Sequence, residues 1–352
     1  MSIEIGLLMF PALMVAIFLG FPVAFALMGI AVLFGYYRFE EALVHQLVAK
    51  VSDVASYYVL AAVPLFVFMG VMLERSGIAE KLFEAIHLWT RRLPGGLAVG
   101  TVLLCVVFAA ASGVVGATEA VVGLLAIPIM LRYNYNKALI SGTICAGGSL
   151  GTIIPPSVVV VILAPVADVS VGDLFVGMLI PGLMLAGFYI LYIVGRCIIV
   201  PSDGPQLPPD PSDPGLLEKL YITATAMLMP LMLIFSVLGT IVLGWATPTE
   251  AAAMGAIGTI ILTIAHGAFD LKTLHEAFVK TLQVTAMILT ILLGGTMFAG
   301  VFVALGGISA VEGMTNAAIA GWIVHGGGHP DADMAEVINR VLLEGILRRG
   351  EA

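Results

Sequence analysis

Residues 142–157 place two adjacent prolines inside an apolar stretch, and they read Gly142-Thr-Ile-Cys-Ala-Gly147-Gly-Ser-Leu-Gly151-Thr-Ile-Ile-Pro155-Pro-Ser157. A proline has no N–H, so the carbonyl one turn earlier loses its helical partner. Within a membrane, irregular backbone is tolerated only where it is buried in protein or lines a cavity. The break therefore predicts freed carbonyls beside the hydroxyls of Thr152 and Ser157, a plausible site for a hard cation. An ordinary proline kink satisfied by a neighbouring helix is the alternative, although the upstream Gly147-Gly148 favours unwinding.

The composition places this break in a membrane protein. The 352 residues are 60% hydrophobic and 11% charged, with a mean hydropathy of +1.10, whereas soluble domains are about 45–50% apolar and about 25% charged. The charges cluster between long apolar runs, which predicts an all-α polytopic membrane protein. A net charge of −8 with only 15 Lys and Arg residues argues against nucleic-acid binding. Cys105, Cys145 and Cys197 fit no disulfide framework and no metal-site spacing, so we interpret them as packing residues.

A second break lies in the span 94–131. Its two apolar legs, 97–111 and 117–131, would each form about 22 Å of helix, too short for a hydrocarbon core of about 30 Å. Basic residues at both ends of the span place both ends on the cytoplasmic side. These features predict a re-entrant helical hairpin with its tip at residues 112–116. Two short tilted crossings joined by a tight turn are the alternative.

The first apolar run, residues 5–37, is too long for a single crossing or for the apolar part of a cleavable signal peptide. We expect it to break at Gly20-Phe-Pro22. Residues 201–214 carry six prolines, which predicts a hydrated linker between two membrane halves.

These features give a predicted division of the chain. Residues 1–200 form a first membrane repeat, with a re-entrant hairpin at about 94–131 and a broken helix at about 138–167. A linker follows over 201–219, a partial second repeat over 220–310, and an atypical polar tail over 311–352.

The two halves share a weak repeat. The segments that begin at Pro22 and Pro248 agree in proline, alanine, methionine and glycine at matching positions. The predicted topology inverts between them, and inverted repeats with broken helices are typical of secondary transporters. A second repeat as long as the first would extend beyond residue 352, so we expect the second repeat to be incomplete.

Two glutamates, Glu119 and Glu250, lie well inside apolar spans, each within a Thr-Glu-Ala tripeptide. An intramembrane carboxylate is by default a candidate for function. However, Thr247-Pro248-Thr249-Glu250 also has the pattern of a capping box, with proline at the first helical position. We favour capping over direct handling of an ion or proton, and we keep Thr247, Thr249 and both glutamates as candidates for either role.

Three stretches resemble the large membrane subunit, DctM type, of tripartite ATP-independent periplasmic (TRAP) transporters. They are Phe108-Ala-Ala-Ala-Ser112-Gly-Val-Val-Gly116-Ala-Thr-Glu, Gly142 to Ser157, and Gly244-Trp-Ala-Thr-Pro-Thr-Glu-Ala-Ala-Ala. The resemblance covers roughly residues 1–310. It implies an elevator-type fold in the bacterial inner membrane and Na⁺-coupled uptake of organic acids such as C4-dicarboxylates. It also implies two partners, a periplasmic substrate-binding protein and a small four-helix membrane subunit of DctQ type.

The resemblance further implies residue roles. One Na⁺ would be held between the hairpin tip and the unwound helix, at Ser112, Gly113, Gly116, Gly151, Thr152 and Pro155. Pro156, Ser157 and Thr118 lie beside these positions and are candidates to face the substrate. The coupling ion apart, we expect no cofactor.

The sequence leaves two classes of function open. The first is a carrier subunit, and the second is a membrane scaffold that binds partners without moving solute. A membrane enzyme is disfavoured because no His-Glu-x-x-His, Gly-x-Ser-x-Gly or aspartate pair lies in any span. His325 and His329 have a metal-like spacing, but the glycines between them and Pro330 disfavour a helix, so we expect no metal site.

Overall fold

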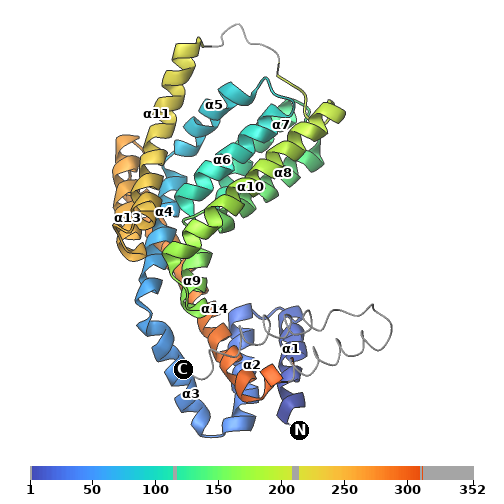
Figure 1. Cartoon of the computed structure of the whole chain (residues 1–352), viewed down its shortest axis with the longest axis vertical. Coiled ribbons are helices and arrows are strands. Elements are labelled where there is room, and N and C mark those ends of the chain that lie inside the picture. The colour runs from blue at the N-terminus through green and yellow to red at the C-terminus, as the bar shows by residue number, and fades with distance from the viewer. Residues whose placement is uncertain (1, 114–116, 208–213, 310, 312–352) are drawn as a thin grey trace, which may run out of the picture. The chain divides into compact units, whose positions relative to one another are not determined.

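The computed structural model describes residues 2–113, 117–207, 214–309 and 311. Across these residues the regular structure is helical and no strand is present, which confirms the predicted all-α fold (Figure 1). The chain divides into two compact units, Met1–Ser56 with Met287–Ala352, and Tyr57–Ala286.

The first unit contains α1 (Ser2–Phe18), α2 (Val23–Phe39), α3 (Ala42–Ser56) and the last part of α14 (Leu271–Ala304). The predicted break between α1 and α2 is confirmed. Gly20 has a left-handed φ of 90° and Pro22 directly precedes α2. Phe10 of α1 packs edge-on against Phe298 and Phe302, with ring centroids 5.5 and 5.2 Å apart.

The second unit holds both predicted breaks. Its helices are η1 (Tyr58–Ala61), α4 (Ala62–Arg75), α5 (Ile78–Thr90), α6 (Gly96–Ser112), α7 (Ala117–Arg132), α8 (Lys137–Ile153), α9 (Val158–Ala167), α10 (Val171–Ile199), α11 (Leu216–Ile234), the π-helical η2 (Phe235–Gly239), α12 (Thr240–Val242), α13 (Pro248–Ala265) and the first part of α14.

Helix α6 forms the centre of this unit. It packs against α4, α5, α7, α8 and α10, and Figure 1 shows α6, α7, α8 and α10 running side by side. Most of its residues are buried, and many of them are glycine or alanine. Small side chains allow neighbouring helices to approach closely, which is how helices associate in lipid.

Five described helices are long and apolar enough to cross a membrane, and a bent pair makes a sixth. They are Tyr58–Arg75, Val171–Ile199, Leu216–Val242, Pro248–Ala265, Leu271–Ala304 and the pair Lys137–Ile153 with Val158–Ala167. The protein is therefore a multi-pass membrane protein. Helix α6, with 17 residues, is slightly shorter than these spans.

The start of the linker is packed against helix ends, contrary to the expectation that it is hydrated throughout. The Gly95 N–H donates to the Gly204 carbonyl over 3.0 Å, and the Leu207 N–H donates to the Arg91 carbonyl over 3.2 Å. Asp203 is only 8% exposed. Proline density excludes a helix but does not exclude docking, because a proline carbonyl and the residues between prolines can still bond. Helix α11 begins at Leu216, inside the predicted linker range.

Candidate functional site

The predicted helix break separates α8 from α9. Helix α8 ends at Ile153, the Ile154 N–H still donates to the Leu150 carbonyl over 2.7 Å, and α9 begins at Val158. The two helices are bent by 43° at this point. Pro155 and Pro156 lack the N–H groups that would continue the helix, so the helix offers no partner to the carbonyls of Gly151 and Thr152. The break thus leaves acceptors at the end of α8.

The hairpin tip docks on this break. Helix α6 ends at Ser112, and Gly113 caps it with a left-handed φ of 62° while its N–H donates to the Ala109 carbonyl over 3.0 Å. The Gly113 carbonyl in turn accepts from the Val158 N–H over 3.3 Å. A Cβ on Gly113 would lie 2.5 Å from the Pro156 carbonyl oxygen. Both the conformation and the close approach therefore require glycine at this position.

Helix α4 supports the tip from another side. A Cβ on Gly70 would lie 2.5 Å from the Ser112 carbonyl oxygen. Gly70 is buried in the middle of α4, so this glycine allows the two backbones to meet. No sequence pattern marks this contact, because Gly70 belongs to no motif and lies far along the chain from the hairpin.

Three buried hydroxyls gather near the contact, and none of their side chains is exposed: Ser112, Thr118 and Ser157. The Ser112 and Thr118 oxygens lie 3.3 Å apart. The Ser157 Oγ has no hydrogen-bond partner among the described residues. A buried polar group left unpaired costs about 1–3 kcal/mol, so the Ser157 hydroxyl is available to bond to a ligand at the break.

The two helix ends at the break differ in polarity. The end of α8 presents carbonyls, which carry partial negative charge. The start of α9 presents N–H groups: its N-cap Ser157 makes no side-chain capping bond, and within the described part of the chain Val159 and Val160 donate no backbone hydrogen bond. The break can therefore hold a cation on one side and an anion on the other.

The structure places one predicted ion-site position of the hairpin beside the break. Gly113 lies against Pro156 and Ser157, and Ser112 directly precedes it at the end of α6, whereas Gly116 lies outside the described residues. Thr152 lies in the last turn of α8, and its hydroxyl donates to the Ser149 carbonyl over 2.7 Å. That bond uses its proton and leaves oxygen lone pairs able to bind a cation.

Glu250 forms the capping box that the sequence pattern predicts. The Thr247 N–H donates to Glu250 Oε2 over 2.8 Å, and the Thr247 hydroxyl donates to the same oxygen over 2.7 Å. The Glu250 N–H donates back to Thr247 Oγ1 over 3.4 Å. The Thr249 hydroxyl lies 3.1 Å from that of Thr247. A role of Glu250 in an ion pathway stays a prediction.

Glu119 has different surroundings although it shares the tripeptide. It lies in the first turn of α7, half-buried, and a Cβ on Gly148 of α8 would overlap its Cγ. A Cβ on the preceding glycine, Gly147, would lie 2.6 Å from the Cys105 sulfur of α6. The predicted glycine pair therefore serves close packing of α6, α7 and α8. Glu119 thus lies at the start of the second hairpin leg and packs against α8, whose end forms the break.

Comparison with known proteins assigns the chain to a family. Residues 10–325 match the family model described as "Tripartite ATP-independent periplasmic transporter, DctM component". The chain belongs to the DctM family of TRAP transporters. The resemblance drawn from the three sequence motifs is thereby confirmed, and the relatives are named as permeases rather than as enzymes, in line with the sequence prediction.

Three DctM relatives indicate the range of the family. The chain is 32% identical over 266 residues to the C4-dicarboxylate TRAP transporter large permease protein DctM of Pseudomonas aeruginosa, a match that covers 75% of the chain and 60% of the relative. It is 28% identical to the protein of the same name from Rhodobacter capsulatus, covering 90% and 74%. It is 28% identical to the isethionate TRAP transporter permease protein DctMQ of Oleidesulfovibrio alaskensis, covering 69% and 37%. The chain thus spans only part of these relatives' lengths.

Proposed function

We propose that this chain is the large membrane subunit of a TRAP-type secondary transporter in the bacterial inner membrane, which couples the uptake of small organic acids to Na⁺. The observation that carries the proposal is the docking of Gly113 on the break at Pro155–Ser157, next to the buried Ser157 hydroxyl, which has no hydrogen-bond partner among the described residues. Helices that break near the midplane and face a re-entrant element are typical of secondary transporters.

The cation side of the break is proposed to bind Na⁺. Hard cations take oxygen ligands, and the carbonyls of Gly151 and Thr152 together with the hydroxyls of Ser112 and Thr152 supply them. Pro155 removes the competing N–H. Gly113 allows the hairpin tip to approach closely enough to contribute oxygens from the other side.

The anion side of the break is proposed to hold the carboxylate of the substrate. The basic residues nearest in sequence to the break, Arg132 and Lys137, lie at the far ends of α7 and α8. Recognition of the carboxylate would thus fall to the Ser157 hydroxyl and the N–H groups at the start of α9. Pro156 and Thr118 flank this position. The names of the relatives above mention C4-dicarboxylates and isethionate, and both are small organic anions.

Two partners complete the proposed transporter. A periplasmic binding protein would deliver the substrate, and a small four-helix DctQ-type subunit would flank this chain. The DctMQ name of one relative supports the second partner. Transport would follow an elevator motion, in which one part of the chain carries the site across the membrane.

Substrate uptake in proteoliposomes tests the proposal. The chain is reconstituted with a DctQ-type subunit and a binding protein from the same source, and uptake of a C4-dicarboxylate is measured with and without a Na⁺ gradient. We expect Na⁺-dependent uptake, and we expect Ser157→Ala to raise the substrate concentration needed by about tenfold, because one hydrogen bond to an ionised group is lost. Ser236→Ala is the matched control, because that hydroxyl bonds to the Leu233 carbonyl in another helix. Assembly of the complex without uptake would contradict the proposal and favour the scaffold.

A further inference from the structure

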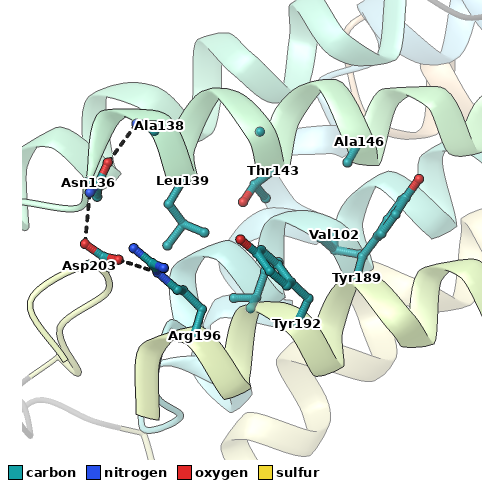
Figure 2. Close-up of a pocket in the computed structure, with 12 residues that line it drawn as sticks. Val102, Asn136, Ala138, Leu139, Thr143, Ala146, Tyr189, Tyr192, Arg196 and Asp203 are labelled. Atoms are coloured by element: carbon teal, nitrogen blue, oxygen red, sulfur yellow. Dashed lines mark hydrogen bonds and ion pairs between the residues drawn. The ribbon is translucent and has the colours of Figure 1, made fainter. Parts of the chain in front are cut away.

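A cavity of about 490 Å³ lies between α6, α8 and α10, at the opposite end of α8 from the break. It is lined by Val102, Asn136, Ala138, Leu139, Gly142, Thr143, Ala146, Tyr189, Tyr192, Ile193, Arg196 and Asp203. Its size is typical of a small-molecule site. Figure 2 shows Asn136, Asp203 and Arg196 together at one end of the cavity, and Thr143, Tyr192, Tyr189, Val102 and Ala146 along the rest of it.

The cavity exists because one face of α8 carries small residues at helical spacing. Ala138, Gly142 and Ala146 recur every four residues, so they lie on one face. A Cβ on Gly142 would meet no atom within 4 Å, although α8 and α10 are packed partners. The cavity therefore results from three small residues on one face of α8 rather than from one missing side chain.

The α8 side also carries a buried hydroxyl that lacks a partner. Thr143 is 3% exposed, and its Oγ1 has no hydrogen-bond partner among the described residues. In Figure 2 this hydroxyl and that of Tyr192 both point into the space between α8 and α10. A buried hydroxyl that faces a cavity is expected to bond to the molecule that fills it.

Arg196 supplies positive charge at the polar end. Its Nε donates to Asp203 Oδ2 over 2.7 Å, while Asn136 Nδ2 donates to Asp203 Oδ1 over 2.9 Å. Both oxygens of Asp203 are therefore engaged, and the pair fixes the guanidinium at the cavity wall. A guanidinium has five donors, and among the described residues Arg196 uses only Nε. The two Nη groups are suited to bidentate binding of a phosphate.

The surroundings point to a lipid. Only 17% of the most apolar window of α10 is buried, so this helix presents most of its surface to its environment. Tyr192 is 66% exposed, and tyrosines collect at the membrane interface. Arg132 and Lys137 lie at the same end of the helices as Arg196, as the Asn136–Asp203 bond shows. Basic helix ends lie on the cytoplasmic side, where the leaflet contains anionic lipids.

We propose that this cavity binds the headgroup of an anionic phospholipid. The phosphate is held by the Nη groups of Arg196 and by the hydroxyls of Thr143 and Tyr192, and the glycerol and first methylenes lie along Leu139 and Ile193. The acyl chains continue over the exposed surface of α10. This site is separate from the transport site and does not depend on the proposed transport activity.

Lipid retention of the purified chain tests the proposal. The full chain is placed in nanodiscs of phosphatidylcholine with a small fraction of phosphatidylglycerol, and the lipids that remain bound after release into detergent are counted by native mass spectrometry. We expect selective retention of phosphatidylglycerol. Thr143→Val and Tyr192→Phe should each reduce that retention about tenfold, the factor for one hydrogen bond to a charged group. Thr143→Val should leave the folded chain intact without lipid, since the hydroxyl bonds to none of the described residues.

Thr263→Val is the matched control, because this buried threonine lies in α13 and its hydroxyl bonds to the Thr259 carbonyl over 2.7 Å. It should leave retention unchanged. Equal retention of phosphatidylglycerol by the wild-type chain, Thr143→Val and Tyr192→Phe would overturn the proposal. So would displacement of the lipid by millimolar inorganic phosphate, because that result would assign the cavity to a soluble anion.

Discussion

At the scale of single residues, the site depends on residues that lack an N–H group, a Cβ atom or a hydrogen-bond partner. Pro155 and Pro156 lack N–H groups, Gly113 and Gly70 lack Cβ atoms that would collide with carbonyl oxygens, and the Ser157 hydroxyl lacks a partner among the described residues. The prolines free acceptors, and the glycines allow other backbones to come close to them. The prolines and Ser157 thus leave polar atoms for a ligand, whereas the two glycines allow the backbone segments around the site to meet.

Glu250 provides the clearest test at this scale, because a cap and an ion ligand respond differently to its charge. Glu250→Gln should keep most of the stability, since the amide oxygen can still accept from the Thr247 N–H and hydroxyl. Glu250→Ala removes the acceptor and should lower stability by about 0.5–2 kcal/mol. Thermal unfolding in detergent measures both variants. If Gln impairs transport as strongly as Ala and neither changes the unfolding temperature, the carboxylate acts in the ion pathway and the capping account is wrong.

Sequence reasoning reached some of these residues and not others. The capping box and the double proline are local patterns, so they can be read within a few residues. The approach of Gly70 to Ser112 joins helices about 40 residues apart, and no local pattern marks it. The unpartnered hydroxyls of Ser157 and Thr143 depend on what surrounds them, which only the packed structure shows.

At the scale of helices and their connections, breaks were predictable because proline and glycine act locally. The interruptions at Gly20–Pro22 and Ile154–Ser157 lie where the sequence predicts them, and α6 ends where the hairpin tip is expected. Helix α3 lies in none of the predicted apolar runs, because its polar residues make it amphipathic rather than continuously apolar. Whether the hairpin is re-entrant stays a prediction.

The packing of the linker start against helix ends was likewise not predictable from its composition. Asp203 links it to Asn136 in the α7–α8 loop and to Arg196 at the end of α10. The Tyr135 hydroxyl of the same loop accepts from the Leu97 N–H over 3.2 Å, and burial raises the pKa of Tyr135 to about 12. A proline-rich segment that contributes one buried carboxylate thus holds three helix ends together.

The pH dependence of stability tests this connection. The Asn136 amide and the Arg196 guanidinium hold the pKa of Asp203 below its ordinary value. A lowered carboxyl pKa stabilises the folded state above the ordinary pKa of about 3.9, and that stabilisation is lost as the pH falls through the lower, folded-state value. Asp203→Asn should therefore lower the unfolding temperature at pH 7, and its difference from the wild-type chain should shrink below about pH 3.9.

Asp53→Asn is the control for this prediction, because Asp53 is exposed and lies 3.6 Å from Lys50 at the surface. An exposed pair of this kind contributes little, so the variant should follow the wild-type curve at every pH. A difference between Asp203→Asn and the wild-type chain that stays constant from pH 7 to pH 3 would show that the carboxylate charge does not stabilise the linker.

At the scale of the whole molecule, composition alone predicted an all-α multi-pass membrane protein, and three short motifs predicted the family. Both are confirmed. The inverted repeat joins segments in both halves of the chain, and its spatial relation stays a prediction. The predicted tail from residue 312 onward and Gly116 lie outside the described residues. Long hydrophobic runs are robust signals because the bilayer fixes their length, whereas the relation between halves depends on tertiary contacts.

The account rests on one claim above all, that the hairpin tip and the broken helix together bind Na⁺. The most direct measurement is the unfolding temperature of the purified chain in nanodiscs as NaCl replaces choline chloride at constant ionic strength. A ligand at ten times its dissociation constant stabilises the folded state by about 1.4 kcal/mol, so the account predicts a Na⁺-specific rise that Ser112→Ala and Thr152→Ala reduce and Ser236→Ala leaves unchanged. An equal rise in all four proteins, or none in the wild-type chain at saturating Na⁺, would contradict it.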